Sequence, residues 1–368
     1  MMNTYGYAAY SCDTSLAPFR FKRRALRRED VAMEVLYCGV CHSDLHTARN
    51  DWKWSVYPVV PGHEIIGRVT AVGEAVSAFK VGELVAVGCM VDSCLQCRYC
   101  TAGEEQMCVE KSVGTYNGVD RITGERTMGG YAKTMVVREE FCLHLPPSLD
   151  VTRAAPLLCA GITTYSPLRA WNVGAGTRLA VVGLGGLGHM AVKLGVAMGA
   201  HVTVISRSPD KEADALALGA HRVLVSGDVA AMEGAADAFD VILDTVPVAH
   251  SMDPYLPLLK ADGTLVLVGQ IGPMPGFSSL PVLGWRRRIS GSHIGGIRET
   301  QEMLDFCAQH NVLPDVEMIR MDQINEAFER MERADVRYRF VIDMATLTDE
   351  QAPAAAQVQE PARALHVR

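Results

Sequence analysis

Short apolar runs alternate with stretches of helical spacing through the second half of the chain. The apolar runs are rich in Val, Leu and Ile, as buried strands are, and the segments between them have the spacing of helices. Strands that alternate with helices predict a parallel sheet with helices packed on both of its faces. We expect its strands at 179–182, 202–206, 222–225, 240–246, 264–270 and 288–296.

The first 150 residues have a different pattern. Short runs with β-strand character, such as 64–73 and 82–88, are separated by glycine and proline turns. A helical pattern follows much later, at 299–311. We therefore expect a β-rich domain over 1–150, an α/β domain over 151–296, a return of the chain to the first domain over 297–347, and a mobile tail rich in Ala, Pro and Gln over 348–368.

A glycine pattern, G-x-G-x-x-G, follows the predicted strand at 179–182 and opens a helical stretch. In that position the pattern indicates dinucleotide binding. Gly183 permits the tight turn, Gly185 lets a pyrophosphate approach the backbone, and Gly188 lets the helix pack on the strand. Free N–H groups at the start of the helix suit phosphates. The alternative is a glycine-rich turn without a ligand. The predicted phosphate-binding residues are Gly183, Leu184, Gly185, Gly186, Leu187 and Gly188.

The residues after the second predicted strand indicate which nicotinamide cofactor is used. Sites specific for NAD place an acidic residue there, which binds the ribose 2′-hydroxyl. This chain has Ser206, Arg207 and, one turn later, Lys211, and its first carboxylate is Asp210, after a proline. Hydroxyls and cations suit a 2′-phosphate, so we expect NADP(H). The alternative is a solvated loop with ordinary surface charges, which does not explain the missing acid.

Composition narrows the class of protein. With 368 residues, 49% hydrophobic and 21% charged, the chain is long enough for two domains and has the composition of a soluble globular protein. Its net charge of −7 argues against nucleic acid or an anionic membrane as a partner. The most apolar stretch, 179–192, is too short to span a bilayer, and the first residues lack the pattern of a secretory signal. We expect a cytoplasmic protein with reduced cysteines.

Four of the eleven cysteines are separated by only two, two and seven residues. Two residues between cysteines let a tight turn direct both sulfurs inward, and four thiolates complete a tetrahedral zinc shell. A site with four sulfurs is closed, so its role is structural. The odd number of cysteines argues against a disulfide framework, and incidental surface cysteines are the remaining alternative. We expect a zinc lobe over 89–110, with the ligands Cys94, Cys97, Cys100 and Cys108.

Three further segments place a cysteine or histidine beside turn-forming residues. They read CGVCHSDLH (38–46), PGHEIIGRV (61–69) and PLLCAGITTY (156–165). Taken singly, each residue has an ordinary interpretation as a buried core residue or a hydrogen-bonded turn histidine. Cys38 and Cys41 also have the spacing of a redox dithiol, although no βαβ pattern surrounds them.

Together these segments resemble a known family, the zinc-containing medium-chain alcohol dehydrogenases, and within it the cinnamyl alcohol dehydrogenase-like aldehyde reductases. The resemblance covers about Tyr7 to Leu347 and adds GGYA (129–132) and GLGGLGHMAVK (183–193) in the same order. It implies an α/β protein, in which a barrel-like, GroES-like catalytic domain is joined to a doubly wound Rossmann domain. It also implies a second, catalytic zinc with an open fourth position. The implied ligands are Cys41, His63 and Cys159.

The resemblance assigns roles to five more residues. Asp44 orients His63 through its second ring nitrogen, and Glu64 lies near the zinc and exchanges with the open position. Ser43 hydrogen-bonds the substrate oxygen, and His46 passes the proton to solvent through the nicotinamide ribose. His42 approaches the cofactor phosphates. The ordinary interpretations are a helix N-cap for Ser43 and an exposed loop histidine for His46.

The implied reaction is reversible hydride transfer between NADP(H) and a primary alcohol or aldehyde, with the protein acting as an aldehyde reductase. Two other classes share part of this pattern: a zinc-stabilised dinucleotide-binding protein without turnover, and a zinc-free quinone reductase. The first should lack Ser43, and the second should lack the zinc ligands. We also expect a homodimer joined through residues 290–295. The substrate pocket is expected to include Trp52, Tyr116 and Ile294.

Overall fold

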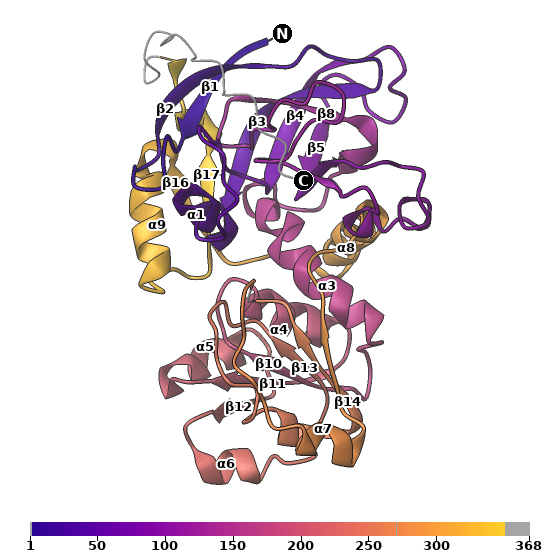
Figure 1. Cartoon of the computed structure of the whole chain (residues 1–368), viewed down its shortest axis with the longest axis vertical. Helices are drawn as coiled ribbons and strands as arrows, with labels where there is room; N and C mark the ends of the chain where they lie inside the picture. The colour runs from indigo at the N-terminus through magenta and orange to yellow at the C-terminus, as the bar shows by residue number, and fades with distance from the viewer. Residues whose placement is uncertain (1, 270, 350–368) are drawn as a thin grey trace.

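Two sheets, one above the other in Figure 1, organise the chain. The computed structural model describes residues 2–269 and 271–349, so most of the tail expected over 348–368 lies outside the described residues. The first sheet has seven strands and the second has six. Two smaller sheets accompany the first: β1 (Met2–Ala8) pairs with β2 (Ala17–Arg23), and β6 (Met90–Asp92) pairs with β7 (Val113–Gly114).

The seven-stranded sheet combines the two ends of the chain. Its order is β16-β17-β3-β4-β5-β9, with β8 also paired to β3. The long strand β3 pairs antiparallel with β17, so the chain returns to this sheet after leaving the second one. The strands are β3 (Asp30–Val40), β4 (Ile65–Val72), β5 (Leu84–Val87), β8 (Thr134–Arg138), β9 (Leu143–His144), β16 (Val316–Arg320) and β17 (Arg339–Asp343).

The six-stranded sheet is parallel throughout, in the order β12-β11-β10-β13-β14-β15. This confirms the predicted doubly wound fold. Two predicted strand boundaries were wrong. The fifth strand begins at Leu259 rather than at residue 264, and Leu259 pairs with Phe239 on the far side of an irregularity in the register. The sixth strand ends at Gly291 rather than at residue 296. The strands are β10 (Arg178–Val182), β11 (His201–Ser206), β12 (Arg222–Val225), β13 (Phe239–Asp244), β14 (Leu259–Leu267) and β15 (Arg288–Gly291).

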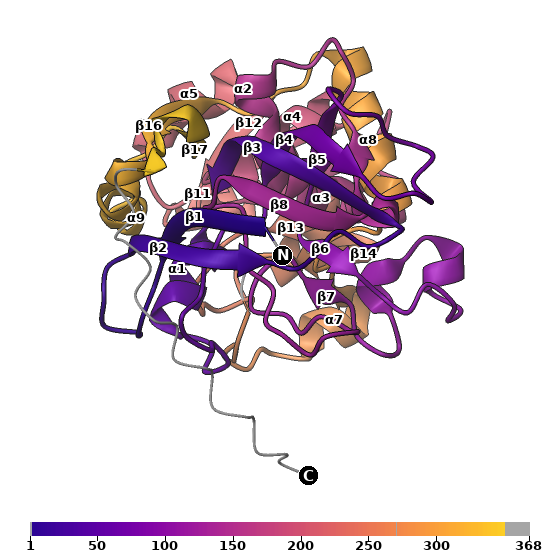
Figure 2. The ribbon, with the colours of Figure 1, turned by 90° about the horizontal axis from the view of Figure 1, so that it is seen from above.

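Helix α3 lies at the junction of the two sheets (Figure 1), and the view from above places α8 and α9 on opposite sides of the first sheet (Figure 2). One apolar core runs through this junction, because Ile66 of β4 and Val202 of β11 belong to the same buried cluster as Ile162 of α3. The helices are α1 (His42–Arg49), α2 (Val151–Ala154), α3 (Ala160–Ala170), α4 (Gly188–Ala197), α5 (Glu212–Ala217), α6 (Val229–Glu233), α7 (Leu280–Trp285), α8 (Ile297–His310) and α9 (Ile324–Glu332).

Across the residues that the structure describes, we find no helix with both the length and the apolar character needed to cross a membrane.

Candidate active site

The end of β3 and the start of α1 place the first group of predicted site residues. Cys41 caps α1, with extended backbone angles, and its N–H donates to the Asp44 carboxylate at 2.9 Å. Ser43 therefore lies inside the helix, and its interpretation as an N-cap is wrong. Asp44 is buried, whereas Ser43 and His46 are half-buried and reachable.

Three segments distant in the sequence converge on one buried cluster. Its ligand atoms all lie within 4.8 Å of one another. The Cys41 and Cys159 sulfurs are 3.8 Å apart, too far for a disulfide bond. Two sulfurs bound at about 2.3 Å to a tetrahedral zinc lie about 3.8 Å from each other, so the pair has the spacing that zinc requires. The cluster consists of Cys41, His63, Glu64 and Cys159.

Asp44 organises the cluster. Its carboxylate accepts hydrogen bonds from the Gly62 N–H and the Tyr131 hydroxyl, each at 3.0 Å, and it contacts His63 Nδ1 at 3.0 Å. Burial alone would lower the pKa of His63, but the Asp44 carboxylate raises it well above its ordinary value. A histidine whose Nδ1 is fixed by a carboxylate presents Nε2 to a metal in one orientation.

The contact between the two cluster thiols shifts their pKa values in opposite directions, with that of Cys159 raised and that of Cys41 lowered. The hydrogen bond from Cys159 lowers the pKa of Cys41 well below its ordinary value, against the effect of burial. The thiolate is the form that binds a metal. The donor chemistry of this cluster therefore fits zinc, with Cys41 already disposed to lose its proton.

A buried ion pair supports the cluster from the far end of the chain. Arg339 of β17 donates to the Glu64 carboxylate, and both side chains are almost completely buried. Burial opposes the charge on Arg339, but Glu64 and the cluster thiols raise its pKa above the ordinary value. In the described chain, Glu64 Oε2 and Arg339 Nε have no hydrogen-bond partner. Sequence reasoning missed Arg339, because no local motif marks it.

The His46 side chain is half-exposed and lies next to Asp51, His42 and Trp52. His46 Nδ1 is 2.8 Å from the Asp51 carboxylate, and the His46 ring lies 6.2 Å from that of His42 and 5.3 Å from that of Trp52. Burial lowers the pKa of His42. Asp51 was not predicted, although its position five residues after His46 offered a signal.

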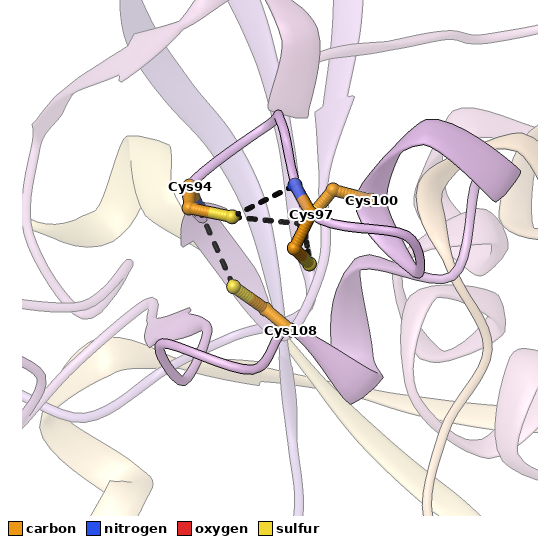
Figure 3. A group of neighbouring side chains, drawn as sticks. All are labelled: Cys94, Cys97, Cys100 and Cys108. Atoms are coloured by element: carbon orange, nitrogen blue, oxygen red, sulfur yellow. Dashed lines mark hydrogen bonds between the residues drawn. The ribbon is translucent and has the colours of Figure 1, made fainter.

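The four-cysteine lobe has a second cluster with the same spacing. The Cys94 and Cys100 sulfurs are 3.8 Å apart, and those of Cys97 and Cys100 are 3.5 Å apart. Figure 3 shows all four side chains directed toward one another. Backbone N–H groups, first that of Cys100, lower the pKa of Cys97 to about 6, while burial raises the pKa of Cys100 to about 12. Zinc fits this cluster as well, with Cys108 as the fourth ligand.

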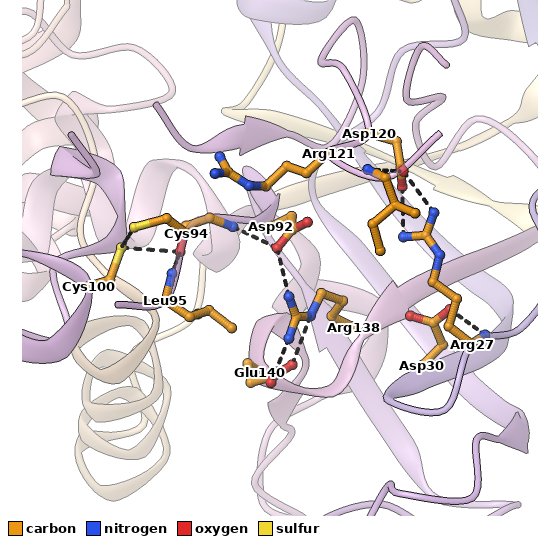
Figure 4. A network of polar contacts seen from close by, with 12 residues as sticks. Arg27, Asp30, Asp92, Cys94, Leu95, Cys100, Asp120, Arg121, Arg138 and Glu140 are labelled. Atoms are coloured by element: carbon orange, nitrogen blue, oxygen red, sulfur yellow. Dashed lines mark hydrogen bonds and ion pairs between the residues drawn. The ribbon is translucent and has the colours of Figure 1, made fainter. Parts of the chain in front are cut away.

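Polar contacts join this lobe to the first sheet (Figure 4). The Ser93 N–H donates to Asp92 at 2.9 Å, and Ser93 Oγ lies 3.2 Å from the Cys100 sulfur. Arg138, at the end of β8, donates to the Asp92 carboxylate at 3.3 Å. The lobe is therefore attached to the sheet immediately before its first ligand, Cys94.

The glycine turn fits a pyrophosphate. Gly183 has a φ of +90°, which strongly favours glycine, and a Cβ on Gly188 would overlap the Gly183 carbonyl. A Cβ on Gly185 would meet no atom within 4 Å, so space is open beside the backbone. Gly186 faces Arg339, whose Cδ would lie 2.9 Å from an added Cβ. Arg339 thus lies between this turn and Glu64.

Comparisons with known proteins give the family. A profile described as an alcohol dehydrogenase GroES-like domain matches residues 27–147, and one described as a zinc-binding dehydrogenase matches 186–309. The chain is 52% identical over 348 residues to NADP-dependent alcohol dehydrogenase C 1 of Mycolicibacterium smegmatis, covering 94% of this chain and 99% of that protein. It belongs to the zinc-binding alcohol dehydrogenases.

Two further similarities concern this dehydrogenase. Aldehyde reductase YahK of Escherichia coli is 51% identical over 352 residues, covering 95% of this chain and 100% of that protein. The structure of a cinnamyl alcohol dehydrogenase from Sorghum bicolor has a TM-score of 0.91 and 46% identity, covering 94% and 99% of the two chains. These findings confirm the predicted fold class and the predicted zinc. The roles given to single residues stay predictions.

The residues predicted to select the cofactor lie at the end of β11 and directly after it. Ser206 is buried at the end of β11, with its Oγ bonded to the backbone of Ser208, whereas Arg207 is exposed. Within the described ranges, neither Arg207 nor Lys211 forms an ion pair. Asp210 is exposed, and its carboxylate accepts a hydrogen bond from the Ser208 hydroxyl at 3.2 Å.

Of the three predicted pocket residues, Tyr116 lies beside a ligand of the zinc cluster. The Tyr116 ring is 5.5 Å from the His63 ring, and Trp52 packs beside His46. Ile294 lines a small cavity together with Cys89, which the sequence analysis left unassigned. The Cys89 thiol donates to the Leu158 carbonyl at 3.6 Å, directly before Cys159 in the chain.

Proposed function

We propose that this zinc-binding dehydrogenase transfers hydride reversibly between NADP(H) and primary alcohols or aldehydes, and that it works as an aldehyde reductase. The observation that carries the proposal is the buried cluster of Cys41, His63, Glu64 and Cys159, whose ligand atoms lie within 4.8 Å of one another and whose first cysteine stands two residues before the half-buried Ser43. Two cysteines and one histidine with an open position are the ligands of a catalytic rather than a structural zinc. Relatives named NADP-dependent alcohol dehydrogenase and aldehyde reductase support the reaction class.

The residues of the chain have separable tasks in this reaction. When bound, zinc supplies a Lewis acid for the substrate oxygen, and NADPH supplies the hydride. Ser43 donates a proton to the developing alkoxide, and His46, held by Asp51, returns a proton from solvent. Asp44 keeps His63 in one orientation. The buried side chains around the cluster exclude water from the reacting atoms.

The reaction is tested by following absorbance at 340 nm with NADPH and a series of medium-length aliphatic and aromatic aldehydes. We expect turnover that a chelator abolishes, and about two zinc ions per chain by elemental analysis, from the two clusters. Ser43→Ala should lower kcat for reduction by about 10²-fold, because general acid catalysis contributes about that much.

Ser43→Thr is the matched control, since it keeps the hydroxyl and should keep most of the rate. An unchanged rate in Ser43→Ala would remove this residue from the mechanism. Binding of NADPH without turnover of any aldehyde would instead point to a dinucleotide-binding protein. Faster oxidation of polyols than of simple primary alcohols would place the chain in another branch of the family.

We also propose a homodimer formed through the second sheet. β15 is an edge strand of this sheet, and the nearby helix α7 exposes Leu280, Leu283 and Trp285. Unpaired strand edges and exposed apolar groups favour association with a second copy. Sedimentation velocity should give about twice the chain mass of 39.9 kDa, and Leu283→Asp should shift it to the monomer. Ile122→Asp, at an equally exposed residue elsewhere, is the control; a monomeric wild-type protein would refute the dimer.

The cellular setting that we propose is the cytosol. All eleven cysteines are free, and both zinc clusters need reduced thiols. A reducing compartment keeps thiols in that form.

A further inference from the structure

A buried carboxylate in the four-cysteine lobe contacts the start of a helix outside it. Glu105 opens the short 3₁₀ turn η2 (Glu105–Met107) and is only 8% exposed. Its Oε2 accepts a hydrogen bond of 2.9 Å from the N–H of Ile297, the first residue of α8. Acidic groups are favourable there, because the first N–H groups of a helix lack partners. In the described part of the chain Glu105 forms no ion pair, so this bond is its principal polar contact.

The backbone of the lobe packs against the same turn. A Cβ on Gly296 would overlap the Gly103 carbonyl, so these two backbones touch and only glycine fits. On the other side, Arg298 donates to the Ala102 carbonyl and covers Gly103. Three contacts therefore hold the start of α8 against the lobe: the Glu105 carboxylate, the backbone contact at Gly103 and the Arg298 guanidinium.

The residues just before α8 line a small cavity that borders the catalytic cluster through Cys89, whose thiol contacts that of Cys159. We call residues 292–297 the connecting segment, because they run from the end of β15 to the first residue of α8. Ile294, Gly295 and Ile297 form one wall of a cavity of about 10 Å³, whose other walls include Cys89 and Leu158. Leu158 immediately precedes Cys159 in the chain. A change in the connecting segment therefore changes the space beside the third zinc ligand.

The connecting segment is also packed closely against α3. A Cβ on Gly295 would lie 2.5 Å from Ile162 of α3, so the segment is packed closely against the junction helix. The hydrogen bond from Glu105 completes this confinement from the side of the lobe. A segment held between two elements keeps its wall of the cavity in one place.

We propose that Glu105 is a positioning residue through which the four-cysteine lobe sets the substrate site. The lobe does more than maintain its own fold: its carboxylate fixes the connecting segment and, through Ile294, the packing next to Cys159 in the proposed catalytic site. This inference rests on the proposed function. It predicts that loss of the carboxylate weakens aldehyde binding without weakening the chemical step.

The test compares Glu105→Ala with Glu105→Gln, whose amide oxygen still accepts the Ile297 N–H. In the alanine variant, hydrogen exchange at the Ile297 amide should become about tenfold faster, the usual result of losing a hydrogen bond to a charged group. KM for aromatic aldehydes should rise about tenfold for the same reason, with kcat within about twofold. Both zinc ions should remain, and the glutamine variant should recover most of KM. Glu104→Ala, at the exposed neighbouring carboxylate, is the control and should behave as wild type.

Each contrary outcome has a separate meaning. Faster exchange with an unchanged KM would refute the positioning role, as would a rise in KM that accompanies loss of zinc, because the effect would then belong to the fold of the lobe. Failure of the glutamine variant to recover KM would also refute it. Absence of aldehyde turnover in the wild-type protein would refute the proposed function instead, and the exchange rates would still report whether Glu105 holds the segment.

Discussion

Replacing Cys159 with alanine is expected to lower kcat/KM for aldehyde reduction by about 10³-fold or more, because a bound zinc contributes several kcal/mol to stabilising charge on the substrate oxygen. The fold should survive. Cys159 lies at the start of α3 on the wall of the site, and alanine is tolerated at a position where no backbone hydrogen bond depends on the sulfur. Elemental analysis should give about one zinc per chain instead of two, and the circular dichroism spectrum should be unchanged.

Cys97→Ala is the matched variant, since it removes a cysteine from the other cluster. There metal binding contributes to folding, so the expected loss is in Tm and yield rather than in the rate per folded molecule. If Cys159→Ala retains wild-type turnover with one zinc lost, Cys159 is not a ligand of the catalytic metal. If Cys97→Ala abolishes turnover at unchanged Tm, the roles of the two clusters have been assigned the wrong way round.

Changing Arg207 to aspartate is expected to reverse the cofactor preference. Charge-assisted hydrogen bonds contribute about 1.5–3 kcal/mol each, so two contacts to a 2′-phosphate should favour NADPH over NADH by about 10²-fold in the wild-type protein. The aspartate repels the phosphate and offers an acceptor to the 2′-hydroxyl of NADH. The ratio of kcat/KM for the two cofactors should therefore change by about 10³-fold.

Arg222→Asp provides the control for the change in charge. Arg222 is also exposed but begins β12, the strand next to β11, and it pairs with Thr203, whereas Ser206 lies at the carboxyl end of β11. It should leave the ratio unchanged. Equal kcat/KM with both cofactors in the wild-type protein would contradict the assignment of Ser206, Arg207 and Lys211.

Local sequence patterns predicted the parts of the fold that are determined by residues close together in the chain. Each strand of the parallel sheet is a short apolar run between helical stretches, so its position was visible without long-range information. The four cysteines of the lobe were predicted for a related reason, because their short spacing lies within one segment, whereas Cys41, His63 and Cys159 were assigned through the family resemblance of their motifs. Cys41, for example, stands directly after β3 and caps α1.

Contacts between distant segments could not be predicted in this way. Arg339 reaches Glu64 only because β17 pairs with β3, and Glu105 reaches Ile297 only because the lobe folds over the start of α8. Neither arginine nor glutamate stands in a pattern that distinguishes it from an ordinary surface charge. The start of β14 was missed for a similar reason, since Leu259 pairs with Phe239 but is separated from the apolar run that begins at Thr264 by the polar stretch 260–263.

The pairing of β17 with β3 has a consequence for how the protein is made. Cys41, His63 and Cys159 all leave the ribosome early, but the strand that carries Arg339 is synthesised near the end of the chain. Until then Glu64 has no partner for its charge, and β3 lacks one of its neighbours. A nascent chain can therefore complete the four-cysteine lobe long before it completes the catalytic centre. The buried pair of Glu64 and Arg339 forms only after β17 has been synthesised.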